Sequence, residues 1–241
     1  MLPADSLVML RSWPDRNQVR AKELRWTPRD EGEAMQTEKA TTTTRRNGTW
    51  HNGLDPAVLH GAVDELRGHP HAATVTMRTR HRWDDGYAVD GSTHEVEQNG
   101  EVTPRNFTFR TDWPPDLGGQ DSGPSPGEAL LGALGGCVAM TYITKAAARG
   151  VDIDELQVVV AATVDLRGVF ELDTIRAGLA GAVVTVRVRS GADDALLTEL
   201  GHTVTRASAV YDSLTHPVPM QLAVQRLPSP GPDSSRAWRT S

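Results

Sequence analysis

The feature that most constrains the fold is a long apolar segment, residues 126–149, that follows a strong helix-start signal. Ser125 is a candidate N-cap, a proline follows it, and Glu128 stands three residues on, which together make a capping box. Gly150 supplies a C-terminal stop. Such a helix would be ~36 Å long. Because no charge lies between Glu128 and Lys145, we expect protein to surround this helix on all sides.

The same segment carries the only cysteine of the chain, Cys137, and three interior glycines. Each glycine costs ~1 kcal/mol in a helix, so a second helix or a sheet should pack closely there. A lone thiol is a buried filler, a reactive nucleophile or half of an intermolecular disulfide. Cys137 stands about eleven residues into the helix, beyond the turn where the helix dipole acts. Activation would therefore need a cation from elsewhere, and the candidates are Arg78, Arg80, Arg82 and Arg110.

The remaining pattern predicts an α+β fold with antiparallel sheets packed around helices. Residues 55–67 read as a short amphipathic helix with Asp55 as N-cap. A period of two in residues 73–83 predicts the first strand of a half-buried antiparallel meander. The other expected elements are strands over 87–97 and 105–112, strands over 156–166 and 182–189, a helix over 193–206 and a last strand over 218–224.

Charge and hydropathy argue against several classes of protein. A net charge of −6 with interspersed charges argues against a nucleic-acid-binding surface. The first residues lack a signal-peptide pattern, and no run approaches the length of a membrane span, so we expect a cytoplasmic protein that does not contact membranes. Residues 1–50 read as a disordered extension in which Met35 is an alternative start, 51–226 as one domain, and 227–241 as a disordered tail.

Other chemistry finds little support in the sequence. There is no phosphate-binding loop or hydrolase motif. His69 and His71 lack the further ligands of a metal site. The carboxylate of Glu128 has a sufficient role in the helix cap. We therefore expect no metal and no cofactor.

The segment Ser125–Cys137 resembles the central-helix motif of the OsmC/Ohr family of osmotically inducible and organic-hydroperoxide-resistance proteins. The flanking runs 165–168 and 208–214 agree, and the likeness extends over about residues 51–226. It implies an intertwined homodimer in which antiparallel sheets wrap around long central helices. It also implies that the cysteine attacks a hydroperoxide, that a hairpin arginine and a glutamate at the helix start stabilise the thiolate, and that a second cysteine resolves the sulfenic acid.

The chain departs from that pattern at two positions. Gly127 stands where the peroxidases have the glutamate, and Ser208 stands where they have the resolving cysteine. Arg82, beside Trp83, is assigned as the hairpin arginine. The resemblance therefore assigns Cys137 and Arg82 as catalytic residues, without an internal disulfide.

Two hypotheses stay open. In the first, the protein is an OsmC-like stress-response protein that uses Cys137 as a one-cysteine thiol peroxidase. It would reduce an organic hydroperoxide or another small electrophile, and an external thiol reductant would restore it. In the second, it is a non-catalytic member of the same fold that binds a small apolar ligand at the dimer interface. The pKa of the thiol separates them, because only the first hypothesis needs it depressed.

Overall fold

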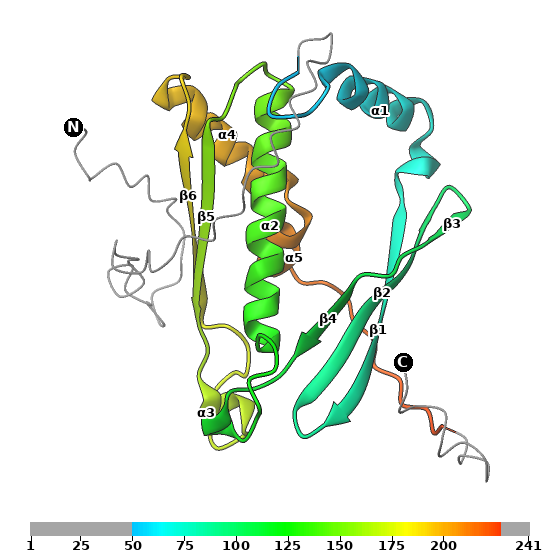
Figure 1. The fold of residues 1–241 in the computed structure, drawn as a ribbon, viewed down its shortest axis with the longest axis vertical. Helices are drawn as coiled ribbons and strands as arrows, with labels where there is room; N and C mark the ends of the chain where they lie inside the picture. Colours follow the sequence, from blue (N-terminus) through cyan, green and yellow to red (C-terminus); the bar gives the residue numbers. More distant parts are fainter. Residues whose placement is uncertain (1–49, 228–241) are drawn as a thin grey trace.

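The computed structural model describes residues 50–227, and these form an α+β fold (Figure 1). The predicted extension over residues 1–50 and the tail over 227–241 lie outside it, except for residues 50 and 227. The helices are α1 (Pro56–Gly68), η2 (Pro70–Ala73), η3 (Pro115–Leu117), α2 (Pro126–Ala147), α3 (Leu166–Val169), α4 (Asp194–Ala207) and α5 (Ala209–Thr215). The strands are β1 (Val75–Asp85), β2 (Ala88–Gln98), β3 (Glu101–Pro104), β4 (Thr108–Thr111), β5 (Glu155–Thr163) and β6 (Gly181–Arg189).

Helix α2 begins at the residue that its sequence predicts and ends at Ala147, two residues before the predicted end. The Ser125 hydroxyl accepts from the Glu128 amide, and the Glu128 carboxylate accepts from the Ser125 amide, which completes the capping box. Gly150 follows the helix with φ +68°, a left-handed conformation that glycine adopts without strain.

The described chain contains one helix, α2, that is long and apolar enough to cross a membrane, with a mean hydropathy of 1.3. The sequence-based statement that no run approaches such a span is therefore wrong for α2. The core helix of a soluble protein passes the same test, so this is weak evidence for a membrane. Only 22% of the apolar window is fully buried in the single chain, and the other residues of α2 are partly or fully exposed.

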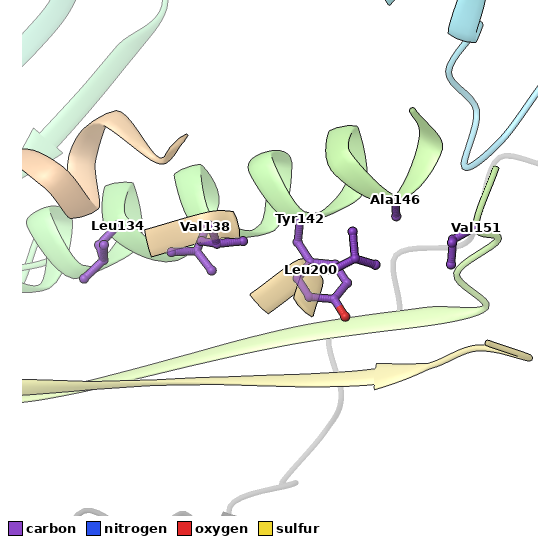
Figure 2. Close-up of a cluster of buried hydrophobic side chains, with 7 residues drawn as sticks. Leu134, Val138, Tyr142, Ala146, Val151 and Leu200 are labelled. Atoms are coloured by element: carbon purple, nitrogen blue, oxygen red, sulfur yellow. The ribbon is translucent and has the colours of Figure 1, made fainter. Parts of the chain in front are cut away.

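One side of α2 forms the core (Figure 2). Leu134, Val138, Tyr142 and Ala146 follow each other at intervals of four and lie on one stripe of the helix. Leu200 of α4 packs on this stripe, and the Tyr142 hydroxyl donates to the Leu197 carbonyl at 2.9 Å. The antiparallel pair β5–β6 covers the same side of α2.

A second antiparallel sheet, β1–β2 with β3 and β4 both paired to β2, makes up the N-terminal half. Its strands alternate as predicted: Val75, Met77 and Trp83 stand on one face of β1, and Thr76 and the arginines Arg78, Arg80 and Arg82 on the other. The predicted half-burial is wrong for the single chain, because every residue of β1 is exposed. Figure 1 shows this sheet standing on the opposite side of α2 from β5–β6.

The C-terminal end also departs from the prediction. Residues 209–215 form the helix α5, and residues 218–224, predicted as the last strand, have no regular secondary structure. The apolar residues of this segment alternate as in a strand, yet their side chains are 47% to 94% exposed (Val218, Met220, Leu222 and Val224). A strand needs a neighbouring strand to accept its backbone hydrogen bonds, and no strand within residues 50–227 pairs with this segment.

Candidate functional site

The candidate site is the contact between Cys137 of α2 and Ser208, which lies between α4 and α5. The Ser208 hydroxyl donates to Cys137 Sγ at 3.1 Å. Ser208 is completely buried, whereas Cys137 is partly exposed. The only thiol of the chain therefore has a fixed polar partner on one side and access to the surface on the other.

Local structure fixes the position of the Ser208 hydroxyl. Ser208 is the N-cap of α5, and its Oγ accepts from the Tyr211 amide at 3.4 Å. An oxygen that accepts from the backbone keeps its proton free to donate elsewhere. That proton points at the sulfur of Cys137. The helix cap therefore both buries the serine and orients it toward the thiol.

The environment of the sulfur favours its thiolate form. Burial raises the pKa of Cys137, but the hydrogen bond from the Ser208 hydroxyl and, after it, the Val210 and Ala209 amides lower it. The lowering effects prevail, and the pKa falls below the ordinary 9.0. These donors are all neutral. Sequence reasoning looked for a cation and missed the amides at the start of α5.

The other residues that the sequence singled out lie elsewhere. Within the single chain, Arg82 Nη2 lies 3.8 Å from Asp90, and the arginine side chain is 65% exposed. Glu128 is held in the cap, where the Ser125 hydroxyl and amide both lower the pKa of its carboxyl. Gly127 has room for a side chain, since an added Cβ would meet only the Ser125 hydroxyl at 3.9 Å.

Ser208 could have been recognised from one local signal. A serine followed by an acidic residue in the first helical turn, here Asp212, is a typical helix start. The signal predicts the cap of α5 but not its neighbour, because Cys137 lies 71 residues away in the chain. Only the packing of α5 on α2 brings the two together.

Comparison with known proteins gives one family match, to the model described as OsmC-like protein, over residues 119–223. No curated protein sequence matches the chain. Among solved structures, an OsmC-like protein from Mycoplasma pneumoniae is 16% identical with a TM-score of 0.45, covering 58% of this chain and 87% of that one. An organic hydroperoxide resistance protein OsmC from Legionella pneumophila is 13% identical with a TM-score of 0.41, covering 58% and 88%.

Proposed function

The chain belongs to the OsmC-like family through residues 119–223, and on that premise we propose that it is a one-cysteine thiol peroxidase. Cys137 is the nucleophile, and an organic hydroperoxide is the substrate. The observation that supports this most is the buried Ser208 hydroxyl, which donates to the sulfur at 3.1 Å. Since the thiolate is the reactive form of a cysteine, a group that stabilises the thiolate raises the reactive fraction.

The chemistry needs two half-reactions. The Cys137 thiolate attacks the terminal oxygen of the hydroperoxide, so that an S–O bond forms, the O–O bond breaks, and the alkoxide leaves as the alcohol after taking a proton. The sulfur is then a sulfenic acid. A low-molecular-weight thiol attacks this sulfur, releases water and leaves a mixed disulfide. A second thiol molecule releases the small-molecule disulfide and restores the Cys137 thiol.

Ser208 explains why the reductant comes from outside. A hydroxyl can hold the sulfenic acid by a hydrogen bond, but it cannot form a disulfide with it. Cys137 is the single cysteine of the chain, so an internal disulfide is unavailable at any position.

A second copy of the chain belongs to the proposal. The stripe of α2 that runs past Cys137 carries Leu130, Ala133 and Met140, and these side chains are exposed in the single chain. A homodimer would cover this stripe with protein and exclude water from the sulfur. Arg82 of the second copy is the cation that we expect near the thiolate.

The direct test is a stopped-flow reaction of the reduced full chain with an alkyl hydroperoxide, followed by trapping of sulfenic acid. We expect one sulfenic acid per chain at Cys137, and turnover when a small thiol is added. Cys137→Ser is the control and should give neither signal. Absence of sulfenic acid after excess hydroperoxide would reject the peroxidase.

The same exposed stripe favours a second candidate, a non-catalytic protein that binds a small apolar ligand beside Cys137. Met140 is 73% exposed and lies one turn from the cysteine. This candidate predicts tight binding of a hydrophobic probe that Met140→Glu abolishes, together with a thiol that alkylates like a free cysteine. A depressed thiol pKa would favour the peroxidase instead.

A further inference from the structure

The polar face of the β1–β4 sheet carries a hollow of about 740 Å³, and its lining in the single chain does not include Cys137. We propose that this hollow binds the phosphate group of a small soluble metabolite. Most of the residues that line it carry a side-chain hydrogen-bond donor or a basic group. The lining residues are Arg80, His81, Arg82, Asp90, Gly91, Ser92, Asn106, Thr108, Phe109 and Arg110. Three guanidinium groups in this set face a single carboxylate.

The strand register gathers the charges on one face. One row across β1, β2 and β4 is Arg80, Ser92 and Thr108, and the row two residues on places Arg82 beside Asp90 and Arg110. Residues paired across strands share a face, and residues two apart on one strand share it too. The intervening row is His81, Gly91 and Phe109, and it belongs to the opposite face.

Gly91 leaves room for the Phe109 ring on the face opposite the arginine rows. Any side chain at Gly91 would overlap the Phe109 ring, which packs edge-on against His81 at a centroid distance of 5.4 Å. The ring therefore lies across the strand on the apolar face. The arginine rows remain on the polar face, although His81 and Phe109 also border the hollow.

Two of the three arginines can still donate hydrogen bonds to an anion. Arg110 is already neutralised, because its guanidinium lies 2.6 Å from Asp90 and 2.9 Å from Asp84. Arg80, in contrast, donates to the His94 imidazole at 2.8 Å. In the single chain Arg82 has only the 3.8 Å approach to Asp90, so a phosphate in the hollow and the thiolate of a second copy are alternative anions for it. A guanidinium in such a position presents a fork of donors that suits phosphate oxygens.

The spacing favours phosphate over carboxylate. Arg80 and Arg82 are two residues apart on β1, so their Cα atoms are separated by roughly 7 Å. Two guanidinium groups at this separation can donate to different oxygens of one phosphate group. Ser92 and Thr108 add hydroxyl donors in the same row as Arg80. A planar carboxylate offers only two oxygens and would leave part of this donor set unused.

The test is calorimetric titration of the full chain with inorganic phosphate and with glycerol 3-phosphate at constant ionic strength, using Cys137→Ser protein so that thiol chemistry is absent. We expect saturable one-site binding of both probes. Acetate and succinate should bind at least tenfold more weakly, and glycerol should not bind. Arg80→Gln should weaken phosphate binding at least tenfold. Arg67→Gln, which removes a paired arginine from α1, should leave it unchanged.

A second variant protects the result against a folding defect. Thr108→Val keeps the size and β-branching of the residue and removes only the hydroxyl, so it should weaken binding several-fold in a folded sheet. Amide NMR shifts on phosphate addition should concentrate at Ser92 and Thr108. Equal affinity for acetate and phosphate, equal loss in Arg67→Gln and Arg80→Gln, or non-saturating heats would each overturn the proposal.

Discussion

At the scale of single residues, the thiol environment rests on neutral hydrogen bonds. The Ser208 hydroxyl and the amides that begin α5 take the place of a cation in the single chain. Sequence patterns predicted the importance of Cys137 from its helix, but they could not place Ser208 beside it. The contact depends on how α5 packs on α2, and no local spacing rule spans 71 residues.

Removing the hydroxyl tests its contribution. Ser208→Ala should slow alkylation of Cys137 at neutral pH by roughly tenfold or more, because a hydrogen bond to a charged group is worth about 1.5–3 kcal/mol. The measurement is the rate of reaction with iodoacetamide. Ser213→Ala, at an exposed serine of α5, is the matched control and should react like the parent chain. An unchanged rate in Ser208→Ala would show that the hydroxyl does not stabilise the thiolate.

The pH dependence of the same reaction carries its own prediction. The folded pKa of Cys137 lies below 9.0, so the alkylation rate should rise with pH through a midpoint below that of the urea-unfolded chain. Below the folded pKa the thiol is protonated and the rate should fall in both states. Coincident midpoints in folded and unfolded protein would contradict the lowered pKa.

A gain of chemistry is expected from Ser208→Cys. The substituted side chain would place a second sulfur where Oγ now lies 3.1 Å from Cys137 Sγ, close enough to attack a sulfenic acid after a small adjustment. Treatment with one equivalent of hydroperoxide should then give an intramolecular disulfide, seen as the loss of two hydrogens in the mass of the intact chain. A persistent sulfenic acid in this variant would mean that the two groups do not meet in solution.

At the scale of elements, the sequence predicts best where the signal is local. The N-caps of α1, α2 and α4 lie at Asp55, Ser125 and Asp193, as their residue types indicate. The hairpin β1–β2 follows from alternation and turn residues, and β5 and β6 coincide with two β-branched runs. The strand expected over 218–224 is not formed, because a strand needs a neighbouring strand and none of the described strands pairs with this segment.

The loop between β4 and α2 depends on one buried carboxylate. Asp112 is 1% exposed and accepts from the Ser122 hydroxyl and from the Trp113, Ser122 and Gln120 amides, which together lower its pKa from 3.8. A carboxyl whose folded pKa is lowered stabilises the fold above its unfolded pKa, and this stability is lost as the pH falls through the folded pKa.

Asp112→Asn should therefore lower the urea midpoint of unfolding at pH 7, and the difference from the parent chain should shrink toward pH 2. Asp116→Asn, at an exposed carboxyl of the same loop, provides the control and should have little effect at either pH. A difference that stays constant between pH 7 and pH 2 would show that the Asp112 charge does not hold the loop.

At the scale of the whole molecule, several apolar surfaces are exposed in the part of the chain that the structure describes. They are the apolar face of the β1–β4 sheet, the Cys137 stripe of α2 and the alternating segment over 218–224. Exposed apolar side chains gathered on one surface are typical of an interaction site. A second copy of the chain would place one helix against the apolar face of the β1–β4 sheet, another against the Cys137 stripe and a strand beside residues 218–224. Covering them would also account for the exposure of α2, without a membrane.

The interior glycines of α2 provide the sharpest test of that second copy. Gly135 packs against Val160, where an added Cβ would lie 3.4 Å from Cγ2, so its role is met within the chain. Gly136 has no atom within 4 Å of an added Cβ, and a single chain would accept a larger residue there. We therefore expect Gly136→Leu to convert a dimer into monomers at micromolar concentration, measured by sedimentation velocity. Gly201→Leu, on α4 and equally open, should stay dimeric. If Gly136→Leu sediments as the parent chain does, no second copy packs against this face of α2, and the dry environment proposed for Cys137 must have another origin.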